Sequence, residues 1–210
     1  MTCAVRDDAV PANLGGLRPG PRRRLMDAGL ELFGTRGYEA TTIADLCREA
    51  KVSTRDFYRH VGDRIDLFMA VFEEEADRIL GPVAGALQAV PPDLVQRTQV
   101  WVSTWLGTVL HDRRRYRVLY TEAIGVSDTL DRRRREILRS SCELAASQLE
   151  ICAAARGEQH PPGHYSVAAA AIMGAAREVL MQYVEGAIVA DADEIVDTVA
   201  RAILLMGFGW

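Results

Sequence analysis

The chain has 210 residues, of which 49% are hydrophobic and 26% are charged, and its net charge at pH 7 is −4. This composition is ordinary for a soluble globular protein, and the length allows one large domain or a small domain joined to a medium one. No apolar run approaches the roughly 18 residues that a membrane span needs, and the first 20 residues lack a signal peptide's apolar core, so we expect a cytoplasmic protein without a membrane partner.

The charge is distributed unevenly along the chain. Residues 18–64 hold ten Arg and Lys against seven Asp and Glu, whereas residues 65–210 hold fourteen against twenty. A basic N-terminal part on an acidic body suggests a polyanion partner for the first part alone.

The N-terminal third is predicted to be entirely helical. Residues 1–18 are rich in Pro, Gly and charge and predict a flexible tail. A helix over 22–36 follows, and Gly37 ends it. Thr42, Ser53 and Asp63 each stand three residues before an Asp, which is a capping-box pattern. These caps divide the next stretch into helices over 42–49, 53–60 and 63–80, and the first two are joined as tightly as in a helix-turn-helix.

The remaining two-thirds reads as a helical bundle. We expect helices over 93–111, 115–125, 129–156, 164–190 and 192–207, with no strand-like alternation between them. The sequence therefore predicts an all-α fold with a helix-turn-helix domain over 19–79 and a second domain over 80–210, and the 63–80 helix connects them. Arginine runs at 113–115 and 132–135 are interpreted as solvated faces paired with nearby acids.

The short helix over 53–60 carries an unusual outward face. With Phe57 set inward at 100° per residue, Arg55, Tyr58 and Arg59 point outward. A solvated basic face would explain them if they stood alone, but a major groove admits one helix, and there Arg can pair with guanine. The helix start at 42 and the region of Arg64 offer further groups to phosphates. The candidate DNA contacts are Thr41, Thr42, Ser53, Thr54, Arg55, Tyr58, Arg59, His60 and Arg64.

The segment from Arg22 to about Ile79 resembles the DNA-binding domain of TetR-family transcriptional regulators. The matching pieces include "LMDAGLELFGTRGYEATTIADLCREAKVSTRDFYRHVGDRIDLF". The resemblance implies a three-helix DNA-binding domain, a ligand-binding and dimerising C-terminal domain, and palindromic operators. Lys51 departs from the pattern because it stands where the family commonly has a turn Gly. Asp56, inside the second helix of the motif, is interpreted as a cap partner of Ser53, and Val61 replaces the usual aromatic residue.

Aromatic and Met side chains in the second domain are candidates for a ligand pocket. Pairs four residues apart share a helix face, for which core packing is the default interpretation; a pocket between bundle helices is the alternative. Such a pocket would favour an apolar or planar effector. The candidate lining residues are Trp101, Trp105, Tyr116, Tyr120, Glu122, Met173, Arg177 and Met181.

The Ala- and Gly-rich segment "SVAAAAIMGAAREVLMQYVEGAIVA" and the last helix could form a four-helix dimer interface, because small residues let helices approach closely. A buried core helix of a monomer is the alternative. The candidate interface residues are Ala169, Ile172, Ala176, Ile195, Val199 and Ile203.

The sequence thus predicts a homodimeric, ligand-responsive repressor that binds a double-stranded DNA operator and requires no cofactor. A regulator controlled by a protein partner without a ligand is one alternative, and an all-α enzyme or small-molecule binder is another. Against an enzyme, the chain has no Glu-x-x-His pair and no Gly-rich phosphate loop. The four cysteines (3, 47, 142 and 152) have no zinc spacing and are interpreted as idle thiols rather than a redox pair.

Overall fold

A computed structural model describes residues 19–207, and the predicted tail over 1–18 lies outside them. Every regular element in this range is helical, which confirms the all-α prediction. The elements are α1 (Pro21–Arg36), α2 (Ile43–Ala50), α3 (Thr54–His60), α4 (Arg64–Gln88), α5 (Leu94–Leu110), α6 (Arg113–Tyr116), the π-helical turn η1 (Arg117–Thr121), α7 (Asp128–Ala155), α8 (Ser166–Val184) and α9 (Ala192–Gly207).

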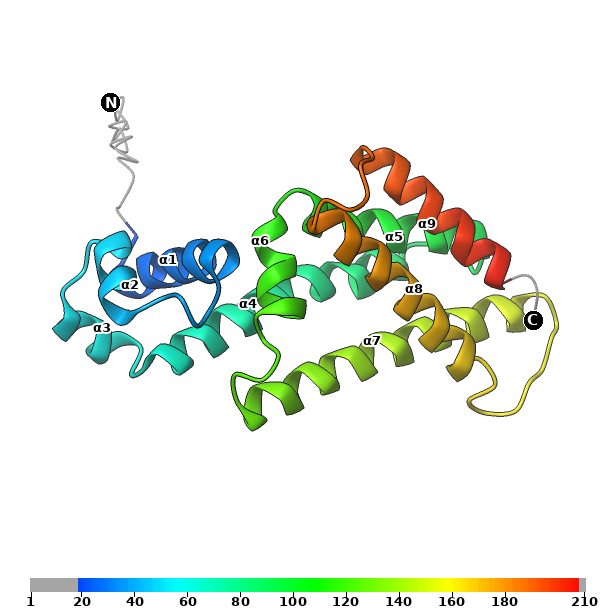
Figure 1. Cartoon of the computed structure of the whole chain (residues 1–210). Helices are drawn as coiled ribbons and strands as arrows, with labels where there is room; N and C mark the ends of the chain where they lie inside the picture. Colours follow the sequence, from blue (N-terminus) through cyan, green and yellow to red (C-terminus); the bar gives the residue numbers. More distant parts are fainter. Residues whose placement is uncertain (1–18, 208–210) are drawn as a thin grey trace, which may run out of the picture.

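The first three helices pack around the start of α4 (Figure 1). Phe33, Phe57 and Phe68 are fully buried where these helices meet. The rings of Phe33 and Phe68 stand edge to face with centroids 5.0 Å apart, a favourable aromatic geometry. Gly37 ends α1 with a φ of 94°, as its predicted role requires.

Helix α4 is longer than predicted, because the Gly81-Pro82 pair does not end it. Pro82 lies inside the helix and is exposed, while Ile79 before it and Val83 and Leu87 after it are buried. Burial on both sides of the proline holds the helix continuous as far as Gln88. The predicted boundary at residue 79 therefore falls inside one rigid element, and α4 runs from the N-terminal helices deep into the bundle (Figure 1).

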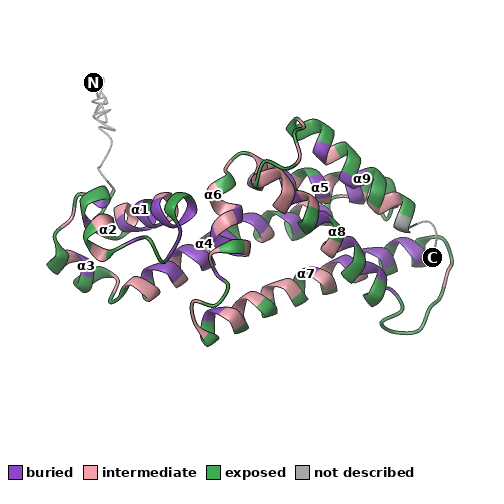
Figure 2. Ribbon diagram, in the orientation of Figure 1, coloured by how far each residue is buried: buried purple, intermediate pink, exposed green. Residues whose placement is uncertain are grey.

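The bundle itself is built on α5, which packs between α4 and α9, and on the long α7, which packs against α8. Figure 2 shows the buried residues concentrated along the inner sides of these helices. A main core extends from the N-terminal helices to α9, and a smaller one gathers Leu94, Leu149, Cys152, Tyr165 and Ile172 near the far end of α7.

Helix α8 is more apolar than the sequence-based expectation that no apolar run is long enough to span a membrane. By length and composition, its 19 residues would suffice to cross a membrane. In the structure, however, Ala169, Ile172, Ala176 and Leu180 form a buried stripe along it. Core helices of bundles share this composition, so α8 is accounted for as a packed bundle helix.

Candidate nucleic-acid interface and cavities

Helix α2 begins with the predicted capping box. The Asp45 N–H donates to Thr42 Oγ1 at 3.2 Å, and the Thr42 N–H donates to Asp45 Oδ2 at 3.1 Å. The helix ends at Lys51, whose φ of 53° is the only positive value at a non-glycine position among residues 19–207. The Arg24 guanidinium donates to the Lys51 carbonyl at 3.1 Å, which helps to hold this strained turn.

Helix α3 is capped by Ser53, as predicted. The Asp56 N–H donates to Ser53 Oγ at 3.0 Å, and the Ser53 hydroxyl donates back to Asp56 Oδ2 at 2.7 Å. This hydroxyl contact lowers the pKa of Asp56, which therefore stays ionised. Asp56 also lies 3.4 Å from the Arg59 guanidinium. Its carboxylate thus orients the helix start and one arginine, in agreement with its predicted capping role.

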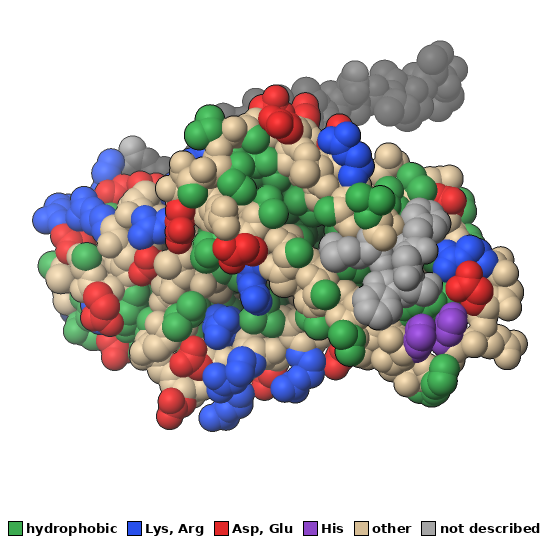
Figure 3. Space-filling view, turned by 45° about the vertical axis from the view of Figure 1, so that its right-hand side comes forward, with side chains coloured by type: hydrophobic (Ala, Val, Ile, Leu, Met, Phe, Trp, Pro, Cys, Tyr) green, Lys and Arg blue, Asp and Glu red, His purple; other side chains and the backbone are tan. Residues whose placement is uncertain are grey.

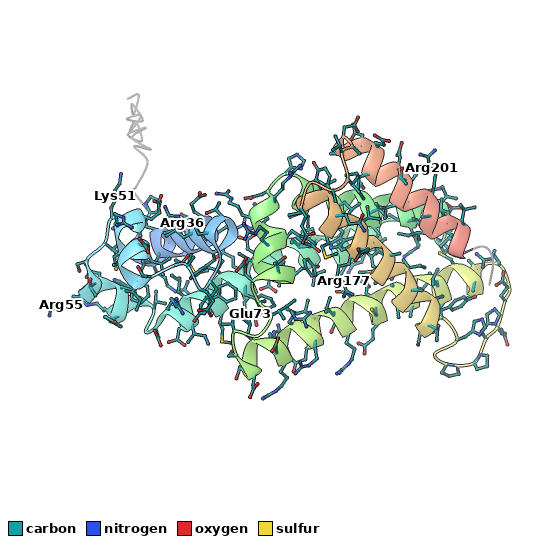
Figure 4. The ribbon with its side chains drawn as sticks, viewed as in Figure 1. Arg36, Lys51, Arg55, Glu73, Arg177 and Arg201 are labelled. Carbon is teal, nitrogen blue, oxygen red and sulfur yellow. The ribbon has the colours of Figure 1, made fainter. Side chains whose placement is uncertain are left out.

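The outward face of α3 has the predicted composition. Phe57 is fully buried and anchors the helix, whereas Tyr58 is 55% exposed and its ring stands edge to face against Phe57. Arg55 and Arg59 are exposed, and Figure 4 shows Arg55 pointing away from the protein at the tip of the molecule. Ser53, Thr54 and His60 are exposed as well. Contact of these side chains with DNA remains a prediction.

Of the predicted DNA contacts, Thr41 has a structural role instead, and the half-buried Arg64 has a structural role as well. The Thr41 side chain is fully buried, and its hydroxyl donates to the Gly37 carbonyl at 2.7 Å, so it cannot reach a phosphate. The Arg64 guanidinium donates to the Thr41 carbonyl at 2.9 Å and stacks 4.1 Å from the centre of the Tyr38 ring. Arg64 thereby ties the start of α4 to the loop before α2. Thr42 alone of the threonine pair stays on the surface, as the cap.

Helix α6 and η1 fasten the bundle to α1. Glu122 Oε2 accepts the Tyr38 N–H at 3.0 Å, and Glu122 Oε1 accepts from Arg117 at 2.9 Å. Arg117 also donates to the Thr35 carbonyl at 2.7 Å, while Arg114 pairs with Glu31 of α1. We call these contacts the clasp. Glu122, predicted to line a pocket, is thus an interdomain residue. In the 113–115 run, Arg114 and Arg115 pair with acids as predicted, although Arg115 is largely buried.

The centre of α4 carries a buried carboxylate that sequence reasoning missed. Glu75 is 2% exposed, and its Oε2 lies 3.1 Å from Arg115 Nε. Burial raises the pKa of Glu75, although the charges of Arg115 and Arg78 act in the opposite direction. A glutamate inside an amphipathic helical pattern has no sequence signal that separates it from a surface residue.

Three apolar cavities lie in a row beside α7. The distal cavity, of about 30 Å³, is lined by Leu94, Thr98, Trp101, Trp105, Leu149 and Met173 among others. The middle cavity, of about 120 Å³, shares Trp101, Trp105 and Met173 with it and adds Leu80, Val83 and Leu144. The proximal cavity, of about 10 Å³, shares Leu80 with the middle one and adds Phe72, Tyr120 and Arg134.

Of the predicted pocket residues, Trp101, Trp105, Met173 and Tyr120 line these cavities. Tyr116 does not; it is buried in the core, with its ring 4.9 Å from that of Tyr120. Met181 packs against the main core, and Arg177 is exposed. Arg97 and Gln148 line the distal cavity and were missed, because nothing in their sequence context distinguishes them from surface residues.

The predicted dimer residues are on the wrong faces of their helices. Five of the six are at most 5% exposed within a single chain, and the sixth, Ile203, packs against the core. The helical period of 3.6 residues correctly predicted an apolar stripe on these helices, but the stripe faces the protein's own bundle. The residues concerned are Ala169, Ile172, Ala176, Ile195, Val199 and Ile203.

No metal site is evident in the described part of the chain, where no group of three His, Cys, Asp or Glu side chains is suitably placed. Cys47, Cys142 and Cys152 are free thiols. Burial raises the pKa of the Cys142 and Cys152 thiols, which makes them less reactive.

Comparisons with known proteins agree with this geometry. The sequence model described as bacterial regulatory proteins of the tetR family matches residues 25–71. The transcriptional activator FasR of Mycolicibacterium smegmatis is 29% identical over 99 residues, which are 47% of this chain and 45% of that protein. The chain thus matches less than half the length of its curated relatives.

Solved structures share the whole fold. The fatty acid degradation regulator FadR from Bacillus halodurans superposes with a TM-score of 0.77 at 17% identity, over 90% of this chain and 96% of that one. FadR from Bacillus subtilis, solved in complex with stearoyl-CoA, gives 0.74 at 16% identity, over 86% and 96%. The matched segment shows that residues 25–71 form a helix-turn-helix domain of the tetR family of bacterial regulatory proteins, and the superpositions show that the chain shares the all-α fold of such regulators.

Proposed function

We propose that the chain acts as a homodimer on a palindromic operator, with α3 of each protomer in the major groove. The observation that carries this proposal is the exposed Arg55, Tyr58 and Arg59 face on a helix that Phe57 anchors. One two-turn helix reads too few base pairs for useful specificity, and a two-fold dimer roughly multiplies the discrimination. We assign residues 19–79 to DNA binding and 80–210 to the regulatory body.

The dimer is proposed to form through the outer faces of α8 and α9. Val167 is 73% exposed and Leu205 is 79% exposed. Ala170, Ala171 and Ala175 are exposed on α8 near Val167, and small side chains let a partner helix approach closely. Replacing Ala171 with Glu on this face is expected to shift the protein to monomers in ultracentrifugation, and an unchanged dimer would refute this assignment.

The effector is proposed to be a small, largely apolar molecule that enters the cavity row. The cavity walls support this, because they are almost wholly aliphatic and aromatic. One structural neighbour is named as a regulator of fatty acid degradation, and another was solved with stearoyl-CoA, so fatty acyl compounds are the first class to test. We propose a cytoplasmic, non-enzymatic protein, by analogy with these regulators.

The clasp supports a mechanism of population shift. A ligand that prefers a more open cavity row would displace Tyr120 in η1, and Glu122 follows one residue after η1. Movement there would tilt α1 and α4 and change the spacing of the two α3 helices. We propose that this releases the operator, as in a repressor. Because the relative FasR is named an activator, the sign of regulation has to be measured.

The proposal is tested by selecting bound duplexes from a randomised DNA pool at moderate salt. The wild-type protein is compared with an Arg55→Ala, Tyr58→Ala double variant, and Arg201→Ala on α9 serves as an exposed control. We expect an inverted repeat that the double variant loses and the control retains, since each base contact contributes about 1–3 kcal/mol. Equal enrichment by the double variant would refute α3 as the reading helix.

A further inference from the structure

Helices α2 and α3 begin with the same spacing of polar side chains. In each, a hydroxyl side chain caps the helix, an Asp stands three residues later, and an Arg follows after three more and pairs with that Asp. The two sets are Thr42, Asp45 and Arg48 on α2 and Ser53, Asp56 and Arg59 on α3. The repeated arrangement makes α2 an internal reference for the role of the carboxylate on α3.

The carboxylate on α3 does not complete a capping box, unlike the one on α2. In α2, Asp45 Oδ2 accepts the Thr42 N–H at 3.1 Å, which is the second half of the box. The cap of α3 uses Ser53 Oγ, which accepts the backbone N–H of residue 56 and needs no carboxylate. Among the described residues, the Asp56 carboxylate instead contacts two side chains, the Ser53 hydroxyl at 2.7 Å and the Arg59 guanidinium at 3.4 Å. The start of α3 therefore does not explain the negative charge of Asp56.

Helix stability gives no better explanation of the Asp56–Arg59 pair. Both side chains are partly exposed, and exposed ion pairs contribute little to stability because water competes for both charges. Because the Ser53 hydroxyl lowers the pKa of Asp56, this carboxylate is charged at neutral pH. The chain thus keeps an ionised carboxylate at the edge of the helix face that is proposed to enter the groove of a polyanion. Phosphates repel such a charge, so its presence there points to a role in recognition.

Asp56 lies beside Arg59 at the edge of the outward face of α3. Three residues correspond to about 300° around an α-helix, so the two residues are about 60° apart around its axis. Arg55, by contrast, forms no hydrogen bond or ion pair within residues 19–207 and points away from the protein (Figure 4). Figure 3 shows Lys and Arg side chains at the end formed by the N-terminal helices, with Asp and Glu side chains among them. The outward face thus combines one unrestrained arginine with one that a carboxylate restrains.

A paired arginine and carboxylate match one kind of base pair in the major groove. The groove edge of G·C presents two acceptors, guanine N7 and O6, followed by one donor, cytosine N4. Arg59 supplies two donors and Asp56 supplies an adjacent acceptor, which is the complementary order. No other base pair presents two acceptors and then a donor in the same direction. The carboxylate has no donor of its own, so an acceptor of another base placed beside it is repelled.

We propose that Asp56 determines operator specificity by acting with Arg59 as one reading unit for a G·C base pair in each half-site. Arg59 donates to the guanine, while Asp56 holds the guanidinium toward the base and accepts from the paired cytosine. This inference rests on the proposed function, because it requires α3 to lie in the major groove. It extends that proposal from a basic contact face to a residue whose negative charge selects the sequence by rejecting other base edges.

The experiment selects duplexes from a randomised DNA pool with the full-length wild type and three single variants. Asp56→Asn removes the charge and keeps an oxygen acceptor for the Ser53 hydroxyl, and Arg59→Ala removes the other half of the reading unit. Asp45→Asn is the matched control, because it removes the same charge beside Arg48 on α2.

We expect the wild type to select G·C at one position of each half-site. The preference over other base pairs should fall by about 5-fold or more in both Asp56→Asn and Arg59→Ala, since a good bidentate contact discriminates roughly 5- to 150-fold. Asp45→Asn should retain the preference. Both Asp→Asn variants remove one charge that phosphates repel, so both should bind non-specific DNA more tightly than the wild type at low salt.

Three results would overturn the inference. In the first, Asp56→Asn keeps the wild-type preference at every position, including the case in which it binds all sequences equally more weakly, as a purely structural residue would. In the second, Asp56→Asn and Arg59→Ala lose preferences at different base pairs. In the third, Asp45→Asn loses the same preference. The proposed function stands in each case if the Arg55→Ala, Tyr58→Ala double variant loses the inverted repeat, whereas a wild type that enriches no sequence would overturn the proposed function and this inference together.

Discussion

Gly34 is the position where a single methyl group should force the N-terminal helices away from the bundle. It lies in α1 opposite Arg114 of α6. An added Cβ would stand 2.4 Å from Arg114 Cβ, 2.8 Å from its Cα and 3.0 Å from its carbonyl oxygen. Two of these three atoms are backbone, so no side-chain rotation relieves the clash.

The displacement that Gly34→Ala requires can be estimated from these distances. Ordinary van der Waals contact begins near 3.4 Å, so α1 and α6 must separate by roughly 1 Å. Overpacking of this kind costs about 1–3 kcal/mol, partly offset by the roughly 0.5–1 kcal/mol that alanine gains over glycine in a helix. We expect a net loss of about 1–2 kcal/mol in the free energy of unfolding, together with weaker operator binding or a weaker response to effector.

Gly107→Ala is the matched control, because Gly107 lies inside α5 and a Cβ there meets nothing within 4 Å. It should raise stability by about 0.5–1 kcal/mol. The assay is urea unfolding of both variants beside operator titration with and without effector. If Gly34→Ala proves as stable as Gly107→Ala and binds the operator like wild type, then α1 and α6 are not rigidly joined and the clasp mechanism fails.

Three further changes probe the same structure. Glu122→Ala leaves the Tyr38 N–H without its acceptor and should destabilise the protein by about 2 kcal/mol in urea unfolding, whereas Glu122→Gln, which keeps an acceptor, should recover part of the loss; equal losses would contradict the hydrogen-bond account. Lys51→Gly relieves the left-handed strain and should raise the unfolding midpoint slightly, by about 0.5 kcal/mol net of backbone entropy, while a lower midpoint would show that the lysine side chain stabilises the turn. Burial raises the pKa of Glu75, so the folded state holds the proton of this carboxyl more tightly than the unfolded state does. The free energy of unfolding of the wild type should therefore fall relative to that of Glu75→Gln as pH rises from the unfolded pKa through the folded pKa. Parallel pH profiles of the two proteins would contradict a raised pKa for Glu75.

The local fold was predictable because its signals are short-range. The side chains of Thr42 and Ser53 accept hydrogen bonds from backbone N–H groups three residues away. The amino-acid sequence alone therefore indicates where α2 and α3 begin. The helical period of 3.6 residues then predicted correctly which face of α3 points inward, because Phe57 is the only buried residue of that helix. The helix predicted over 63–80 ended too early, because the burial that keeps α4 continuous past Pro82 comes from helices far away in the sequence.

The candidate sites were less predictable because they depend on which helix faces which. An apolar stripe on α8 looks the same whether it faces the chain's own bundle or a second copy, and here Ile172 and Ala176 face the bundle. Thr41 and Thr42 are chemically identical, and only the fold buries the first. The clasp joins residues more than 80 positions apart, such as Tyr38 and Glu122, which no single-sequence pattern connects.

The position of η1 suggests why one segment serves both packing and signalling. It is the only π-helical turn among residues 19–207, and such turns are often found at functional sites. Tyr120 on η1 closes the proximal cavity, and Arg117 on the same turn donates to the α1 carbonyl of Thr35. A wider turn can revert to α-helix with little loss of hydrogen bonding, and the resulting shift in register would move the cavity wall and the clasp together. In the proposed mechanism, the five residues of η1 would couple occupancy of the cavity row to the orientation of α1.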